Sequence, residues 1–157
     1  MELPHALSCF VCGESNPLGL RLRFHAHGGE VHAEFIPRPE HVGFKGVVHG
    51  GLQATVLDEI LVWACAVATG RFGYCAELTV RFQRPVRPGE KLSVRARLVE
   101  NKRDRIHVAE AEIRNEAGEI CSTGSGKYLP IANEVLKPML EEFRGGSGQF
   151  ANPPPWS

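Results

Sequence analysis

Hydrophobic and polar residues alternate along most of this 157-residue chain, which is typical of strands with one buried face. The alternation first covers residues 20–25 and 31–35, and the glycine turn at 27–30 between them predicts a β-hairpin. Four longer alternating runs follow at about 72–84, 90–100, 105–115 and 119–130, with proline or glycine near most of their ends. The pattern therefore predicts six antiparallel strands.

One segment does not alternate. Residues from Gly50 to about Thr69 contain no proline, and Gly70 is suited to end a helix. At 100° per residue, apolar side chains cover nearly the whole circumference of this helix, which is typical of a core helix. One apolar helix among six strands predicts an α+β fold in which an antiparallel sheet of five to six strands wraps one long central helix.

Two neighbouring acids, Asp58 and Glu59, interrupt this apolar helix. Glu59 falls close to the stripe that contains Val56 and Trp63, and Asp58 falls near Leu61, so neither acid has a solvated side of its own. Because burial of an unpaired carboxylate is costly, the two acids indicate a cleft beside the helix. The alternative is a helix that is only partly covered, with both acids in solvent.

His49-Gly50-Gly51 stands where the helix should start. Free backbone N–H groups and the positive end of the helix dipole lie at such a position, and glycine lets a ligand atom approach closely. The arrangement is suited to hold a developing oxyanion. The simpler interpretation is an ordinary glycine-containing helix start.

Composition narrows the function classes. Lys+Arg and Asp+Glu both total 18, so the formal net charge is zero and does not favour binding to nucleic acid or to an anionic membrane. The longest apolar run, Ile60–Ala68, is shorter than the roughly 20 residues that a membrane span requires, and the first ten residues lack a signal-peptide pattern. Five cysteines do not form a disulfide framework, which indicates a reducing, cytoplasmic setting.

Cys9 and Cys12 form a C-x-x-C pair ahead of the first predicted strand. The pair is half of a zinc site, and His5, His25 or His27 are the candidates to complete it; we expect no metal on this basis alone. A basic run across two strands includes Arg81 and Arg84. It indicates either the solvated face of a sheet or a site of contact with phosphates.

Three stretches resemble a known family. The helix entry "GFKGVVHGGLQATVLDE" at 43–59 has a glycine loop, His-Gly-Gly, and an Asp seven residues beyond the second glycine. The later strand "ELTVRFQRPVRPGEKL" and the opening "CFVCGESNPLGLRL" are similar to the same family. Over about residues 9–130 the chain resembles the hotdog-fold thioesterases, specifically the PaaI-like acyl-CoA thioesterases.

The resemblance implies a site and a reaction. Asp58 would act as general base or nucleophile at an acyl-CoA thioester, and the Gly51 N–H, with Gly50, would polarise the carbonyl while His49 fixes the loop or the thioester. The resemblance implies no cofactor. It further implies that Thr55, Cys75 and Thr79 line the substrate site. We add Arg81 and Arg84 as candidates for the CoA phosphates, and Glu59 either as a further site residue or as one that faces a polar gap in the sheet. In some family members a serine stands at the position of Cys75 and an asparagine at that of Gly43.

The spacing of the helix residues adds a geometric expectation. Gly51 and Asp58 on one straight helix lie about 10 Å apart along the axis. An oxyanion donor and a base that act on one carbonyl must lie closer, so we expect a two-fold dimer that combines Gly51 of one chain with Asp58 of the other. The resemblance implies the same shared sites, and the dimers can pair into tetramers.

Other functions remain in competition. A non-catalytic acyl-CoA or small-molecule binding module on the same fold is the main alternative. Hydration or dehydration chemistry would use a differently spaced Asp/His pair, and zinc-dependent or nucleic-acid roles rank last. The acyl group is open between an aryl and a short or medium chain, with Phe44, Leu52, Trp63 and Phe72 as candidate pocket residues.

We expect three parts along the chain: a lead at 1–19 with Cys9 and Cys12, a hotdog domain at 20–131, and a C-terminal part at 132–157. The last part begins with a short charged helix from Ala132 to Arg144 and continues as a Gly/Pro-rich tail.

Overall fold

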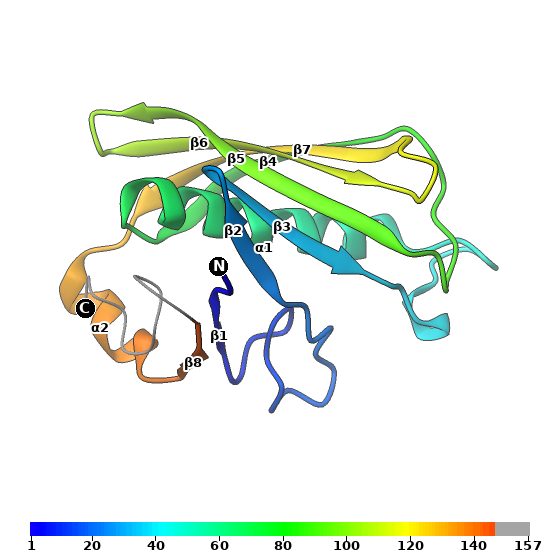
Figure 1. Ribbon diagram of the computed structural model, residues 1–157, viewed down its shortest axis with the longest axis horizontal. Coiled ribbons are helices and arrows are strands. Elements are labelled where there is room, and N and C mark those ends of the chain that lie inside the picture. Colours follow the sequence, from blue (N-terminus) through cyan, green and yellow to red (C-terminus); the bar gives the residue numbers. More distant parts are fainter. Residues whose placement is uncertain (147–157) are drawn as a thin grey trace.

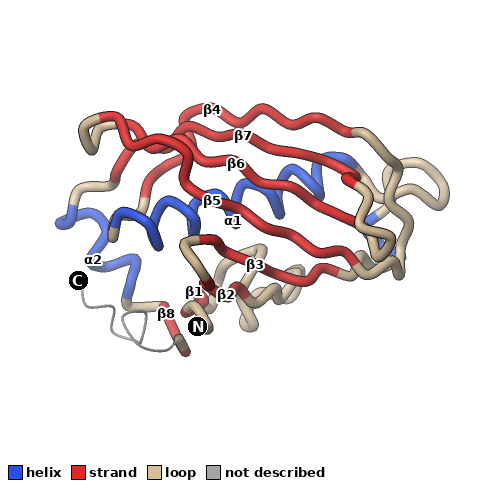
Figure 2. Tube along the Cα trace, turned by 45° about the horizontal axis from the view of Figure 1, so that its top comes forward, coloured by secondary structure: helices blue, strands red, loops and turns tan. Residues whose placement is uncertain are grey.

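The computed structural model describes residues 1–146, and the end of the predicted Gly/Pro-rich tail, 147–157, lies outside the described residues. One long helix, α1 (Gly50–Thr69), lies against a six-stranded antiparallel sheet (Figure 1). Across the sheet the strands follow the order β2-β3-β5-β6-β7-β4, as Figure 2 shows. These strands are β2 (Phe24–His27), β3 (Glu30–Phe35), β4 (Gly73–Phe82), β5 (Leu92–Lys102), β6 (Ile106–Arg114) and β7 (Ile120–Pro130). The predicted α+β fold, with a central helix wrapped by the sheet, is confirmed.

The ends of α1 follow the local sequence. His49 occupies the N-cap position with an extended backbone, and Gly70 ends the helix in the left-handed conformation with φ of 72°. The helix is long and apolar enough to cross a membrane by length and composition alone, but half of that stretch is buried inside the protein. Its contacts with β3, β4, β5, β6 and β7 identify it as the core helix of this fold.

Glycines on β7 set the distance between helix and sheet. Gly124 and Gly126 face α1, and a Cβ added at Gly124 would lie 3.3 Å from the Cβ of Leu57. A Cβ at Gly126 would lie 2.5 Å from Cε2 of Tyr128, whose ring is completely buried across that glycine. Since glycine in a strand interior permits such a close approach, the two positions let the helix and the Tyr128 ring fit onto β7.

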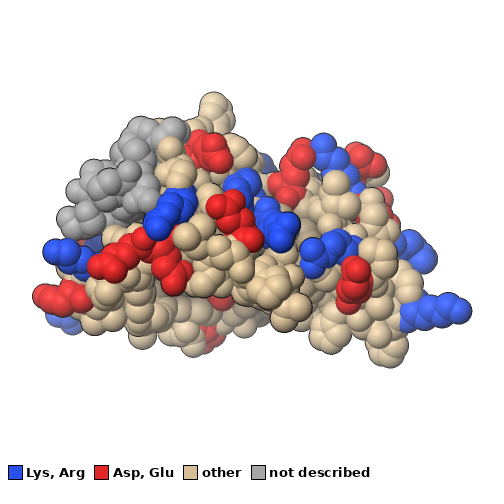
Figure 3. Space-filling model, turned by 90° about the horizontal axis from the view of Figure 1, so that it is seen from below, with Lys and Arg blue, Asp and Glu red and all other residues tan. Residues whose placement is uncertain are grey.

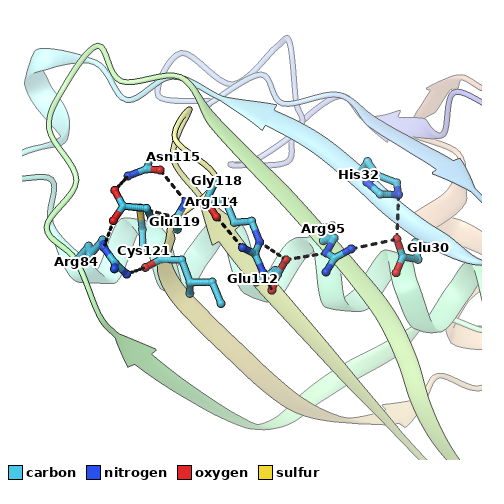
Figure 4. A network of polar contacts seen from close by, with 11 residues as sticks. Glu30, His32, Arg84, Arg95, Glu112, Arg114, Asn115, Gly118, Glu119 and Cys121 are labelled. Carbon is cyan, nitrogen blue, oxygen red and sulfur yellow. Dashed lines mark hydrogen bonds and ion pairs between the residues drawn. The ribbon is translucent and has the colours of Figure 1, made fainter.

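The outer face of the sheet carries paired charges. Arg95 lies 2.7 Å from the Glu112 carboxylate, which also accepts a hydrogen bond from Arg114 at 2.6 Å (Figure 4). The hydrogen bond from Arg114, followed by that from Arg95, lowers the pKa of the Glu112 carboxyl. Acidic and basic side chains are also interspersed on the opposite face of the molecule (Figure 3). Much of the basic run of the sequence is thus partnered by carboxylates.

The two terminal segments meet below α1. The short strand β1 (Pro4–Ala6) pairs with β8 (Phe143–Gly145), and neither strand follows from the hydrophobic pattern. The predicted helix to Arg144 is therefore too long: α2 covers Asn133–Leu140. Beyond it, Phe143 packs against the rings of Trp63 and Phe72, with centroids 6.0 and 5.6 Å away. Tertiary contacts with β1 and with these rings override helix formation there.

The first predicted strand begins later than its alternation suggests. Leu20 and Leu22 donate backbone hydrogen bonds to Phe10 and Val11 of the lead, and Arg21 has a positive φ of 59°. A positive φ at a residue other than glycine interrupts extended structure. The lead thus occupies the backbone groups of 20–22, and pairing with β3 starts only at Phe24.

We predict that Gly126→Ala lowers the free energy of unfolding by about 1–3 kcal/mol, because the new Cβ overlaps the buried Tyr128 ring. Urea denaturation measures the change. Ser125→Ala is the matched control, since Ser125 is exposed on the other face of β7. Equal stability of the two variants would contradict the packing described for this face.

Candidate active site

The start of α1 presents one engaged and one available backbone N–H. The Gly51 N–H donates to Nδ1 of His49 at 2.8 Å, which places the ring proton of a neutral His49 on Nε2. Within residues 1–146, the N–H of Gly50 meets no acceptor. While the His49 bond holds, the donor expected at Gly51 is engaged, and Gly50 is left to reach a ligand at the positive end of the helix dipole.

A pocket of about 410 Å³ opens at this helix start. His49, Gly50 and Arg84 line it together with two aromatic rings, the largely exposed Phe44 and the half-exposed Phe82. Arg84 is oriented by the Glu119 carboxylate at 3.0 Å and the Ile120 carbonyl at 2.9 Å (Figure 4). The pocket therefore combines apolar surface, one cation and a free backbone donor.

The Asp58 carboxylate lies farther along α1, near the sheet edge formed by β4. Its Oδ1 accepts a hydrogen bond from the Tyr128 hydroxyl at 2.8 Å. Cys75 on β4 stands opposite Tyr128 in register, directly before a bulge between Cys75 and Glu77. Burial, and then the charge of Asp58, raise the pKa of both the Tyr128 hydroxyl and the Cys75 thiol. Both groups therefore stay protonated beside Asp58 near neutral pH, and Tyr128 holds the carboxylate in place.

Three further predicted site residues lie in two places. Thr55 donates its hydroxyl to the Gly51 carbonyl at 2.9 Å, one turn back on α1. Thr79 and Arg81 project from the outer face of the sheet, since the alternate residues of β4, Leu78 and Val80, pack against the core. The structure thus does not bring Thr79 or Arg81 together with Asp58.

Two of the candidate acyl-pocket residues belong to the core. Trp63 and Phe72 are almost completely buried, with ring centroids 5.1 Å apart in an edge-to-face contact. Leu52 is partly buried against the same core. Among the four aromatic and aliphatic candidates, only Phe44 lines the pocket at the helix start.

Glu59 points away from Asp58 into the lead. Its Oε1 lies 3.6 Å from Sγ of Cys9 and 3.6 Å from Sγ of Cys12. Burial is the main cause that raises the pKa of the Glu59 carboxyl to about 8. The hydrogen bond from Cys12 lowers the pKa of the Cys9 thiol below its ordinary range. The second acid of the helix is thus neither solvated nor part of the Asp58 cluster.

Strand β4, next to this region, forms an open edge of the sheet. It is the last strand of the sheet next to β7, and most of its ten residues are exposed. Tyr74 and Phe82 are each about half exposed at its two ends, with 53% and 54% of their surface accessible. A long, unpaired edge with exposed rings is a surface that proteins normally cover.

Sequence reasoning missed Tyr128 and Phe82 as site residues. Phe82 lies over Gly50, where an added Cβ would come 3.1 Å from its ring. For Tyr128 a signal existed: Gly124 and Gly126 precede it at the two nearest positions on the same face of the strand. Two glycines in one strand face leave space that a large neighbouring side chain fills.

The fold is a single α+β unit, and its one core helix carries both the Asp58 carboxylate and an accessible N-terminus. The family model described as "Thioesterase superfamily" matches residues 45–122. No curated protein matches the chain.

Several solved structures share the fold. The thioesterase superfamily protein RHA08564 is 28% identical with a TM-score of 0.73, covering 77% of this chain and 62% of that one. The Escherichia coli PaaI protein from the phenylacetic acid degradation operon is 20% identical with a TM-score of 0.66, covering 72% and 81%. The smu.793 protein from Streptococcus mutans, bound to acetyl CoA, is 16% identical with a TM-score of 0.65, covering 71% and 89%. This chain thus spans less than two thirds of the length of RHA08564.

The chain belongs to the thioesterase superfamily and has its hotdog fold. The predicted family resemblance is thereby confirmed. The match begins at Lys45, just before the helix start, and includes both the pocket residues from Val47 to Gly50 and Asp58.

We predict that the Tyr128–Asp58 hydrogen bond couples these residues by about 1 kcal/mol, within the usual range for groups in contact. A double-mutant cycle of Tyr128→Phe and Asp58→Asn, followed by urea denaturation, measures the coupling. Both replacements keep side-chain volume nearly unchanged, so cavity effects are small. Strictly additive effects of the two substitutions would contradict a stabilising contact.

Proposed function

We propose that this protein hydrolyses acyl-CoA thioesters, with Asp58 as general base or nucleophile and the N–H of Gly50 polarising the thioester carbonyl. The observation that supports this most strongly is that Tyr128 holds the Asp58 carboxylate in place beside an open sheet edge. The N-terminus of the same helix leaves the Gly50 N–H available. Membership of the thioesterase superfamily supports a hydrolase of this general kind. The acetyl CoA bound to smu.793 supports a CoA thioester as the ligand class.

The reaction needs two groups on opposite sides of one carbonyl. Asp58 takes a proton from water as the water oxygen attacks the carbonyl carbon, or attacks that carbon itself. The carbonyl oxygen then carries negative charge, which an N–H at the positive end of a helix dipole stabilises. In the general-base route the CoA thiolate leaves and takes up the proton from Asp58, and the free acid remains. If Asp58 attacks instead, the thiolate leaves an anhydride between the acyl group and Asp58, and water then hydrolyses this anhydride to the free acid and restores the carboxylate.

His49 and Gly51 together position the loop at the helix start. The Gly51 N–H holds the His49 ring through Nδ1, and this fixes the loop ahead of Gly50. Gly43 leaves room for the ring, since a Cβ there would lie 3.0 Å from its Cδ2. We propose that Nε2–H of His49 faces the thioester, while Thr55 secures the first turn through the Gly51 carbonyl.

The two groups belong to different chains of a dimer in this proposal. Eight residues separate Gly50 from Asp58, a distance of about 12 Å along the helix. One protomer therefore does not supply both groups to one carbonyl. We propose that two copies pair across the open β4 edge, so that a two-fold axis brings one copy's Asp58 beside its partner's helix start and creates two shared sites.

The substrate would follow the chemistry of the pocket. Phe44 and Phe82 offer apolar surface for an aryl or a short to medium acyl chain. Arg84 offers a cation for a CoA phosphate, and Cys75 lies close enough to Asp58 to contact the acyl end of a bound thioester. Arg81 and Thr79, on the outer face of the sheet, would reach substrate only through an extended CoA tail or a neighbouring chain.

We predict that Asp58→Asn lowers the rate of acyl-CoA hydrolysis about 10²–10⁴-fold, because the variant loses its base or nucleophile. A panel of aryl, short-chain and medium-chain acyl-CoAs measures the rates. Glu134→Gln is the control, since Glu134 is exposed on α2. If wild type shows only background rates across the panel but binds acyl-CoA, the binding-module alternative replaces hydrolysis.

We predict that Gly50→Pro lowers kcat about 10²–10³-fold, because proline removes the N–H that the proposal assigns to the carbonyl. Proline is well tolerated at the first position of a helix, so α1 should persist. Gly50→Ala is the matched control: it adds the same Cβ near Phe82 and keeps the N–H. Equal rates for the two variants would remove Gly50 from the proposed mechanism.

Mixing Asp58→Asn with Gly50→Pro chains tests whether the sites are shared. A mixed dimer would contain one intact site, formed by Gly50 of the first chain and Asp58 of the second. With random exchange of chains, we expect roughly a quarter of the wild-type rate. Two inactive chains that stay inactive after exchange would show that each site lies within one chain.

A further inference from the structure

The lead of the chain brings two thiols to a carboxylate of the core helix. Cys9 is partly buried, Cys12 is almost completely buried, and both sulfur atoms lie 3.6 Å from the same oxygen, Oε1 of Glu59. All three ligand atoms lie within 4.8 Å of one another. Within residues 1–146, no lysine, arginine or histidine forms an ion pair with Glu59. In its ionised form Glu59 thus has no cationic side chain of the described residues to balance its charge.

The turn from Cys9 to Gly13 is shaped around the first sulfur. The backbone N–H groups of Val11 and Cys12 both donate to Sγ of Cys9, each at 3.3 Å. Gly13 closes the turn through its N–H to the Cys9 carbonyl, and a Cβ there would lie 2.4 Å from that oxygen. Since N–H donors stabilise a thiolate over a thiol, this backbone favours the form of cysteine that binds metals.

The two distances from sulfur to the Glu59 oxygen fit a tetrahedral metal ion. Zinc binds sulfur at about 2.3 Å and carboxylate oxygen at about 2.0–2.2 Å, and two such ligands at a tetrahedral angle lie about 3.6 Å apart. Both sulfur-to-oxygen distances in this cluster are 3.6 Å. The cluster therefore needs no rearrangement of these two pairs to receive an ion between them.

We propose that Cys9, Cys12 and Glu59 form a binding site for a divalent metal ion of the zinc class. Two thiolates and one carboxylate are ligands that favour zinc over magnesium or calcium, which prefer oxygen alone. The described residues supply three ligands within reach, and the fourth position of a tetrahedral ion is left to water or a small anion. His5, a candidate from the sequence, is not among the three.

The proposed ion would connect the lead to the core helix next to Asp58. Glu59 and Asp58 are adjacent on α1, but Asp58 faces Tyr128 while Glu59 faces the two cysteines. An ion that bridges 9–12 to α1 adds binding free energy to the folded state. The site is independent of the proposed hydrolysis, because none of its three ligands belongs to the Asp58 cluster or to the pocket at the helix start.

Titration of the reduced, metal-free chain with Zn²⁺ and with Co²⁺ tests the proposal. We expect one equivalent of metal per chain, and with Co²⁺ the absorption of thiolate-to-metal charge transfer. Cys9→Ser and Cys12→Ser should each weaken that absorption. Glu59→Gln should weaken Zn²⁺ binding at least about tenfold, since loss of a mere supporting residue around a metal already costs 10–100-fold.

Cys75→Ser is the matched control for metal binding, because Cys75 is an exposed thiol outside the cluster. It should bind Zn²⁺ as tightly as wild type. Thermal unfolding gives a second measurement: at the same Zn²⁺ concentration, the Tm of wild type and of Cys75→Ser should rise more than the Tm of Glu59→Gln. Circular dichroism of each variant shows whether it is folded.

Three outcomes would overturn the proposal: no stoichiometric binding by the reduced chain, equal loss of binding in Cys75→Ser, or unchanged affinity in Glu59→Gln. A chain isolated with Cys9 and Cys12 joined by a disulfide, and unable to bind Zn²⁺ after reduction, would assign the pair to redox chemistry instead.

Discussion

The close packing of α1 on β7 is the contact on which the rest of the structure depends. Gly124 and Gly126 remove two side chains from the strand face beneath the helix, so Leu57 and the Tyr128 ring lie directly against the backbone. Tyr128 then reaches the Asp58 carboxylate with its hydroxyl at 2.8 Å. A larger residue at either glycine would push the helix outward and separate these two groups. Packing in the core thus sets the position of the candidate base.

The two adjacent acids of the apolar helix find different polar partners. Successive residues on a helix point about 100° apart, so Asp58 and Glu59 necessarily meet different surroundings. Asp58 is stabilised by a hydroxyl donor at an edge that remains open. Glu59 turns to two thiols in the lead, where burial raises the pKa of its carboxyl to about 8. Neither acid is left without a polar partner, which accounts for their presence in a core helix.

The helix start and the open edge of the sheet are the two features that organise the proposed site. His49 caps the helix by accepting from Gly51, and this choice leaves the N–H of Gly50 as the available donor. Phe82 at the end of β4 covers Gly50, so the edge strand contributes to the pocket as well as to the open surface. A partner copy at this edge would border both the pocket and Asp58.

Local pattern predicted much of the fold. Alternation located the four long strands, and an all-apolar stretch ended by Gly70 located α1, because strand and helix periodicities are properties of a few neighbouring residues. The hairpin of β2 and β3 also followed from its glycine turn, although Leu20 and Leu22 pair with the lead instead. The strands β1 and β8 were missed because a three-residue strand has too few positions to show alternation.

The sequence by itself determined which residues could carry chemistry: His-Gly-Gly at a helix start, Asp58 and Glu59 on the helix, and a pair of cysteines ahead of the sheet. Only the tertiary structure decided how these residues combine. It joined Tyr128 to Asp58 across 70 positions of sequence, and Cys9 to Glu59 across 50. It also turned Thr79 and Arg81 to the outer face and placed Trp63 and Phe72 in the core. The physical reason is that side-chain partners depend on strand order and on the distance between helix and sheet, and both are set by packing between segments far apart in the chain.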